Sequence, residues 1–274
     1  MQSIGFNKYL PVGDPRVCVE FLSKWGIDEI VVLDISATPK RQKPDFALVK
    51  EISKRIFVPL TVGGGIKTLE DMRELLHCGA DKISINAIAL ENPRIIREAA
   101  LVFGNQCIVV SLDVKKNKNG KYEIFSDSGG VPTGLDVVSF AKKVEDLGAG
   151  EILINSIDRD GSKSGYDVTL VSMVCAAVRI PVIACGGVGL PRHFLEGFEK
   201  GGASATAAGN FFHFTEHSPI LVKSYLAQKK MDVRLDTYAD YQDINFDQKT
   251  GRIIKRGEQY LDKLRFEYLP EEVI

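Results

Sequence analysis

Short runs of aliphatic residues alternate along the chain with longer segments whose apolar positions recur every three to four residues. The short runs are continuously apolar, which is typical of parallel strands covered on both faces. We predict strands at 30–34, 60–62, 83–86, 108–113, 152–156, 182–184 and 205–208. The longer segments predict helices, among them 68–78, 92–102, 137–147 and 192–200. This order indicates an α/β fold built from repeated βα units.

An internal repeat appears when the chain is shifted against itself by 122 residues without a gap. The matched pairs are Gly26 with Gly148, Glu29 with Glu151, Ile30 with Ile152, Pro59 with Pro181, Gly64 with Gly186, Gly65 with Gly187, Glu74 with Glu196, and Gly79 with Gly201. A doubly wound open sheet has no reason to repeat at half its length. The repeat therefore favours two half-barrels that form a (β/α)8 TIM barrel.

The repeat also predicts the domain organisation. We expect a barrel at 1–235, with half-barrels of about 1–113 and 114–235, and a C-terminal extension at 236–274 that packs as a helix outside the barrel. The counterpart of strand 108–113 would precede Met1, so seven of the eight barrel strands are visible and the first is missing. A gene start placed one strand too late is the expected explanation, because an unclosed parallel sheet exposes its edges.

Composition and charge narrow the class of protein. The chain is 45% hydrophobic and 26% charged, which is ordinary for a globular protein. It has no apolar run of membrane-spanning length and no export signal, so we expect a cytoplasmic protein. Its 35 basic and 36 acidic residues show no basic cluster, which argues against a nucleic-acid partner. Five scattered cysteines and four histidines lack metal-ligand spacing, so we predict no metal and no cofactor.

Two glycine-rich turns follow strands at equivalent places in the repeat, VGGGI at 62–66 and CGGVG at 185–189. Glycine lets backbone N–H groups approach an anion, and such loops at the mouth of a barrel commonly bind phosphate. Two of them on opposite sides of one mouth suit a substrate with a phosphate at each end. The alternative is that they are plain sharp turns.

Carboxylates at strand ends are the other candidates for chemistry. Asp113 follows an apolar strand, where a carboxylate is partly buried, and we predict a general acid or base there. A backbone-capping role is its alternative. Asp34, Asp158 and Asp160 are further candidates. At the opposite strand ends, Glu29, Lys82 and Glu151 read on composition alone as a salt-bridged plug of the barrel floor. Cys185 faces the mouth but has no evident base beside it.

Several runs resemble the cyclase subunit of the imidazole glycerol phosphate synthase family over roughly 5–235: DEIVVLDISAT, VPLTVGGGI, GADKISINA, GAGEILINSIDRDGSKSGYD, IPVIACGGVG and AAGNFFHF. The resemblance implies a (β/α)8 barrel with twofold internal symmetry. It also implies histidine biosynthesis, with a glutaminase subunit as partner in a heterodimer. Ammonia from that partner would pass through the barrel to a bis-phosphorylated ribulosyl substrate, giving imidazole glycerol phosphate and an aminoimidazole carboxamide ribotide.

The resemblance also implies roles for individual residues. Asp113 matches the acid/base aspartate of the fifth strand, and Glu29, Lys82 and Glu151 match members of a charged gate through which ammonia enters. The predicted substrate- and phosphate-binding set is Asp34, Gly64, Gly65, Asn86, Ala87, Asn155, Asp160, Gly161, Gly186, Gly187, Gly209 and Asn210.

Departures from the family pattern lie at strand ends. Asn155 stands where Thr is usual, Cys185 where Ser is usual, and Gly209-Asn210 where Ala-Ser is usual, while a second catalytic aspartate belongs to the strand missing here. At these positions the chain resembles a paralogous branch of the family. Members of that branch conduct ammonia to a sugar amidotransferase for acetamidino modification of surface or flagellar glycans. A barrel isomerase acting on an aminoaldose phosphate without a partner is a third hypothesis, which the charged floor disfavours.

Overall fold

A computed structural model describes residues 2–214, 217–235, 241, 244–254 and 257. Its central feature is a curved series of parallel strands in the order β11-β10-β9-β6-β5-β4-β3. These strands are β3 (Ile30–Leu33), β4 (Leu60–Gly63), β5 (Lys82–Ile85), β6 (Ile108–Lys116), β9 (Glu151–Ser156), β10 (Val182–Cys185) and β11 (Ala205–Thr206). All seven strands predicted from the apolar runs are confirmed.

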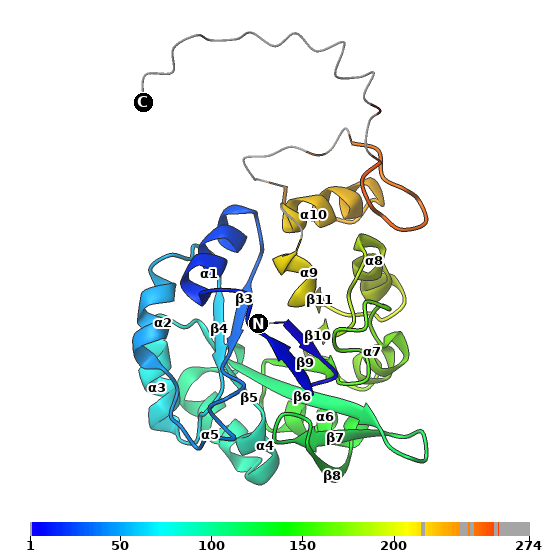
Figure 1. Ribbon diagram of the computed structural model, residues 1–274. Coiled ribbons are helices and arrows are strands. Elements are labelled where there is room, and N and C mark those ends of the chain that lie inside the picture. Colours follow the sequence, from blue (N-terminus) through cyan, green and yellow to red (C-terminus); the bar gives the residue numbers. More distant parts are fainter. Residues whose placement is uncertain (1, 215–216, 236–240, 242–243, 255–256, 258–274) are drawn as a thin grey trace, which may run out of the picture.

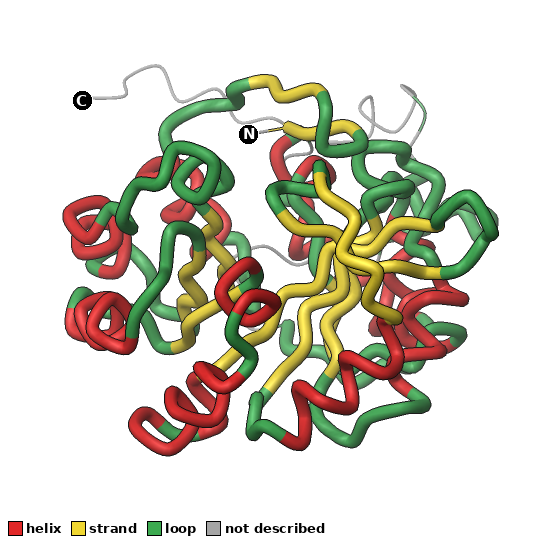
Figure 2. Tube along the Cα trace, turned by 90° about the horizontal axis from the view of Figure 1, so that it is seen from below, coloured by secondary structure: helices red, strands yellow, loops and turns green. Residues whose placement is uncertain are grey.

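Helices cover the outer face of this curved sheet (Figure 1, Figure 2). They are α1 (Pro15–Lys24), α2 (Phe46–Ser53), α3 (Leu69–His77), α4 (Ala87–Glu91), α5 (Arg94–Phe103), α6 (Val137–Asp146), α7 (Val168–Cys175), α8 (Pro191–Glu199), α9 (Asn210–His213) and α10 (Ser218–Gln228), with a 3-10 turn at Asn105–Cys107. The four helices named from the sequence are α3, α5, α6 and α8. The arrangement is an α/β fold of the TIM-barrel type, as predicted.

The core has two layers that follow from strand alternation. One face of the strands packs with the helices in a large cluster that includes Ile83, Leu112 and Ile154. The opposite face points into the barrel, where Val109, Leu153 and Ile183 pack together with part-buried Val31, Cys185 and Ala207. Several inward positions nearest the two rims are polar, among them Lys82, Asp113 and Asn155, and these residues belong to the sites described below.

The two ends of the parallel series, β3 and β11, do not pair with each other in the described residues. Segments beside them are nevertheless joined by their helices and loops. Lys223 of α10 donates to Asp28, which precedes β3, at 2.6 Å, and Leu22 and Ile27 pack against the apolar cluster of the α8–α10 region. The outer layer of the barrel is therefore continuous from its last helices back to its first.

Two antiparallel hairpins were not predicted. The first, β1 (Gln2–Ile4) with β2 (Lys8–Leu10), lies across one end of the barrel, above the parallel strands in Figure 2, against the loops that follow β9 and β11. The second, β7 (Tyr122–Ser126) with β8 (Val131–Asp136), extends β6 at 122–136. The Asn119-Gly120 pair, with Gly120 at φ +73°, is a turn signal from which the β6–β7 connection could have been found.

The expected C-terminal extension falls mostly outside the described residues, which within 236–274 comprise 241, 244–254 and 257. In that part, Phe246 and Ile253 form an isolated antiparallel bridge. The Phe246 ring packs edge-on against Tyr225 of α10, with the centroids 5.7 Å apart. The described helices include none that is both long enough and apolar enough to cross a bilayer.

Candidate active site at the two ends of the barrel

Asp113 lies on β6 at the carboxyl-terminal rim of the strands, in register with Asn155 of β9. Asn86, the last residue before α4, donates its side-chain amide to Asp113 Oδ2 at 3.1 Å and to the Ser111 carbonyl oxygen at 3.0 Å. The structure thus brings together Asp113, Asn86 and Asn155, three polar residues that the sequence places at the ends of three strands.

The surroundings of Asp113 set its protonation. Burial raises the pKa of Asp113 to about 7, and the negative charge of Asp160 acts in the same direction. Hydrogen bonding from Asn155 and Asn86 opposes this rise, because it stabilises the carboxylate. A carboxyl group with a pKa near 7 exists in both protonation states at neutral pH, which is the property required of a general acid or base.

The thiol of Cys185 is the other reactive group at this rim. Burial, with the nearby charge of Asp160 adding to it, raises the pKa of Cys185 to about 12. The thiol is therefore protonated at neutral pH. Since the thiolate is the nucleophilic form, Cys185 is not suited to act as a nucleophile.

One predicted glycine loop lies after β4. Gly64 and Gly65 have φ of +106° and +71°. A Cβ at Gly64 would lie 2.3 Å from the Asp34 carbonyl oxygen, and one at Gly65 would lie 2.6 Å from that of Gln42. Both glycines are thus required by the close approach of the loop that follows β3, whether or not a phosphate binds there. Ala87, the predicted neighbour of this loop, is the first residue of α4.

Asp34 is separate from the cluster around Asp113. Its carboxylate accepts hydrogen bonds from the backbone N–H groups of Ser36 and Ala37 and from the Ser36 hydroxyl, at 2.8 to 3.2 Å. These bonds hold the loop after β3 in the position that contacts Gly64. The side chain is engaged within its own turn.

The second predicted phosphate region lies after β9, β10 and β11, and the β1–β2 hairpin sits against it. Asp160 accepts from the Ser3 hydroxyl at 2.8 Å and from the Phe6 N–H at 3.2 Å. Asn210 exchanges two bonds with the Ser3 backbone, at 2.8 and 3.2 Å. A Cβ at Gly161 would meet the Ser3 carbonyl oxygen at 2.3 Å.

The hairpin contacts were missed at the sequence level, because Ser3 and Phe6 are about 150 to 200 residues from their partners. Gly186 and Gly187, also in this region, have φ of +94° and +100°. A Cβ at Gly187 would meet the Gly165 carbonyl oxygen at 2.3 Å. Gly209 differs, because its φ is −94° and its Cβ would meet nothing within 4 Å.

The three predicted floor charges form one connected group at the amino-terminal ends of the strands. Lys82 Nζ lies 2.8 Å from Glu29 Oε2 and 2.7 Å from Glu151 Oε1. Burial alone lowers the pKa of Lys82, but its bonds to Glu151 and Glu29 outweigh that effect and raise it. Lys82 therefore stays charged.

Thr61 of β4 is a fourth member of this group that sequence reasoning missed. Its hydroxyl donates to Glu29 Oε1 at 2.5 Å. A signal existed, since Thr61 interrupts an otherwise apolar strand and its counterpart in the repeat is Ile183.

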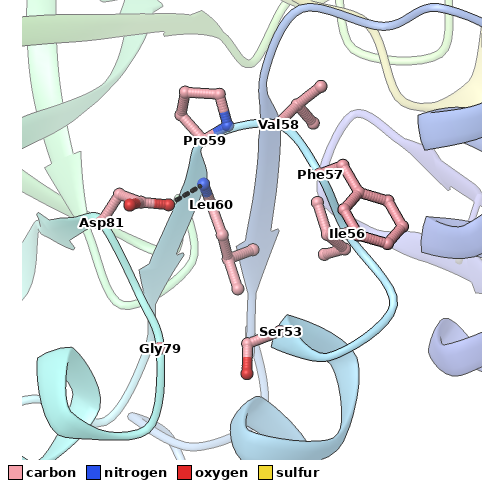
Figure 3. A pocket seen from close by; sticks show the side chains of 8 residues that line it. All are labelled: Ser53, Ile56, Phe57, Val58, Pro59, Leu60, Gly79 and Asp81. Carbon is pink, nitrogen blue, oxygen red and sulfur yellow. Dashed lines mark hydrogen bonds between the residues drawn. The ribbon is translucent and has the colours of Figure 1, made fainter.

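A cleft of about 430 Å³ opens at the same end of the barrel, beside β4 (Figure 3). Asp81 accepts from the Leu60 N–H at 2.8 Å at its edge. Phe57 lines the cleft, and its side chain is 92% exposed. Within the described residues, no group of three or more His, Cys, Asp or Glu side chains could hold a metal ion.

Comparison with known proteins agrees with this arrangement. The family described as "Histidine biosynthesis protein" matches residues 1–218. The "Putative imidazole glycerol phosphate synthase subunit hisF2" of Vibrio vulnificus (strain YJ016) is 46% identical over 247 residues, 90% of each chain. The "Imidazole glycerol phosphate synthase subunit HisF" of Clostridium botulinum (strain Okra / Type B1) is 48% identical over 236 residues, 86% of this chain and 93% of its own.

Neither of these relatives carries a name connected with sugar modification, so the alternative of a paralogue serving a sugar amidotransferase is not supported. The barrel fold, the rim cluster around Asp113 and the long, high-identity matches lead to one assignment. This chain belongs to the histidine biosynthesis protein family, in which it groups with the HisF subunits of imidazole glycerol phosphate synthase.

Proposed function

We propose that the chain is a cytoplasmic cyclase subunit, a lyase-type enzyme that uses ammonia from a glutaminase partner to close an imidazole ring on a bis-phosphorylated ribulosyl aminoimidazole substrate. The observation that carries this proposal is Asp113, a carboxyl group at the barrel rim with a pKa of about 7. Such a group takes up and returns a proton at neutral pH without a cofactor.

The substrate lies across the rim in this proposal. The backbone of Gly64, Gly65 and Ala87 binds one phosphate, while the loops carrying Gly161, Gly186, Gly187 and Gly209 bind the other. Asp113 lies between the two regions. Asn86 donates a hydrogen bond to its carboxylate, and Asn155 is its neighbour in register on β9. The β1–β2 hairpin contacts Asp160 and Asn210 and shields the second region from solvent. Shielding is useful because it strengthens every electrostatic contact inside the site.

The partner docks at the opposite end of the barrel in this proposal. Glu29, Lys82 and Glu151 surround the axis there, and Phe57 offers an exposed apolar contact beside them. Ammonia is small and uncharged, so it passes along the apolar interior between Val109, Leu153 and Ile183, where ammonium would be excluded by the cost of desolvation.

The test is ammonia-dependent consumption of the bis-phosphorylated substrate by the purified chain, with folding checked by circular dichroism. We expect turnover with ammonium chloride alone. With the glutaminase added, we expect turnover with glutamine as well. A folded protein that shows no turnover in either assay would refute the cyclase assignment.

The gate is tested separately with Lys82→Met, which removes the charge but keeps much of the length of the side chain. Glu29 and Glu151 then lose their shared cation, so we expect the glutamine-dependent rate to fall more than the rate with added ammonia. Arg73→Met is a matched control, because Arg73 is on the outer helix α3 and pairs with Glu70. Equal loss of both rates in Lys82→Met would show that Lys82 supports the fold and does not act on ammonia entry.

A further inference from the structure

The inside of the barrel carries polar atoms that have no hydrogen-bond partner. In the described part of the chain, five buried side-chain N or O atoms lack one, and three of them belong to residues of the barrel strands: Glu151 Oε2, Ser84 Oγ and Asn155 Oδ1. Buried polar groups are nearly always satisfied, so each exception calls for a reason. The three occur at the floor, in the middle and at the rim of the barrel.

Asn155 occupies the rim position. It is four residues after Glu151 on β9, and because side chains alternate along a strand, both point to the same face. Asn155 thus stands above the floor group on the inner face. Its neighbours in register are Asp113 on β6 and Cys185 on β10.

The two ends of the Asn155 amide have different surroundings. The side chain lies beside the carboxyl group of Asp113 and lowers its pKa, whereas the Oδ1 atom is buried without a partner. A Cβ at Gly186 would lie 3.0 Å from Oδ1. Gly186 therefore packs close to the Asn155 oxygen and, having no side chain, offers it no side-chain donor.

An amide oxygen accepts hydrogen bonds and carries no formal charge. Its missing partner must be a donor, and ammonia offers three N–H bonds. A neutral acceptor binds ammonia without favouring its protonation, so the nitrogen lone pair that attacks the substrate is preserved. A carboxylate at the same place would instead stabilise ammonium, which has no lone pair.

We propose that Asn155 is a positioning residue for the nitrogen nucleophile: its Oδ1 accepts a hydrogen bond from ammonia that leaves the barrel interior beside Asp113. This role rests on the proposed cyclase function. Ammonia held there lies between the acid/base carboxyl group and the glycine loop at Gly186. Asn155 binds and orients the ammonia, and proton transfer stays with Asp113.

The experiment compares two variants of the full chain that have nearly the same shape, Asn155→Val and Asn155→Thr. Both side chains are β-branched and suit a strand, but only Thr keeps an oxygen that accepts a hydrogen bond. Turnover of the bis-phosphorylated substrate is measured at one fixed pH while ammonium chloride is varied, and then while the substrate is varied. Asn119→Val makes the same change at an exposed hairpin tip and is the control.

For Asn155→Val, the loss of one hydrogen bond predicts an increase in the KM for ammonia of about fivefold to tenfold. We expect the KM for the phosphorylated substrate to stay within about twofold, since no phosphate contact is removed. Asn155→Thr should recover most of the lost affinity for ammonia, and Asn119→Val should match the unmodified chain.

Equal ammonia KM values for the Val and Thr variants would overturn the inference while leaving the cyclase function intact. A fall in kcat with unchanged KM for ammonia would also overturn it, because that result would assign Asn155 only to holding Asp113. Absence of turnover in the unmodified chain would instead refute the proposed function, and with it this role. The three results are distinguishable in one set of assays.

Discussion

The two halves of the barrel have equivalent helices and strands, but they differ in the residues that lie on the inner face and at the rims. Helices α1, α2 and α3 begin and end 122 residues before α6, α7 and α8, and strand β4 is related to β10 in the same way. The aspartates that cap these helices recur as well. Asp14 and Asp45 cap α1 and α2, and their counterparts Asp136 and Asp167 cap α6 and α7.

The differences between the halves lie on the inner face and at the rims. At the floor, Thr61 and Lys82 bond to Glu29, whereas their counterparts in the second half are Ile183 and Ser204. The first half therefore supplies the cation of the charged group at the floor. The helices, the strand and the helix caps that recur are the features that each half-barrel needs in order to fold. The residues that differ include polar positions that the two halves contribute to a common site.

The largest expected effect is a loss of turnover when the ionisable group at the rim is removed. Asp113→Asn keeps an oxygen for the bond from Asn86 but removes the ionisable group. We expect ammonia-dependent turnover to fall on the order of 10² to 10⁴-fold, the range for loss of a general acid or base. The rate at saturating substrate checks this. A variant that retains most of the activity would show that the acid/base group lies elsewhere.

The same substitution should make stability depend less on pH. The pKa of Asp113 is about 7 in the folded protein against a usual 3.8, so the folded state holds a proton that the unfolded chain has lost. Stability from this group therefore falls as pH rises from about 4 to about 7. Asp113→Asn should be more stable than the unmodified chain at pH above about 7, and the advantage should vanish below about pH 4. Urea unfolding across this range measures it.

The glycine loops after β4 and β10 give a direct comparison of the halves. Gly64→Ala should destabilise the protein by about 2 to 3 kcal/mol, since it combines a positive φ with a contact on backbone. Gly186→Ala should cost less, about 1 to 2 kcal/mol, because its closest contact, with the Ser156 carbonyl oxygen, is 2.8 Å and not 2.3 Å. Chemical unfolding of both variants tests this order, and the reverse order would contradict it.

The equivalent caps Asp45 and Asp167 should also differ. Asp45→Ala should cost about 1 kcal/mol, the usual value for a lost N-cap. Asp167 is 7% exposed and also accepts from the Tyr122 hydroxyl at 2.8 Å, so Asp167→Ala should cost about 2 kcal/mol. The unfolding midpoints of the two variants test the difference. In a Tyr122→Phe background the two costs should become similar, and a persistent gap would assign the difference to burial.

The smallest effect is expected at Gly209. Its φ is negative and a Cβ would meet nothing within 4 Å, so Gly209→Ala should change stability by less than about 0.5 kcal/mol. Thermal unfolding beside Gly64→Ala is the measurement. A large loss at Gly209 would mean that this glycine, too, is needed by the backbone.

Much of this molecule could be predicted from the order of its residues. The continuous apolar runs determine the seven parallel strands, because a strand buried on both faces tolerates little else. The repeat predicts which elements are equivalent, and strand polarity predicts that Asp113 and Lys82 lie at opposite ends of the barrel. These features depend on local pattern and on the rule that parallel strands share a direction.

Other features were decided only by the tertiary structure. The contacts of Ser3 with Asp160 and Asn210 join positions more than 150 residues apart. Neither the raised pKa of Asp113 nor the unpartnered Asn155 oxygen can be inferred from neighbours in sequence, because both depend on what three strands and a glycine loop bring around one point. Burial and hydrogen bonding are properties of the assembled interior. They determine which of the polar residues at the strand ends form a site together.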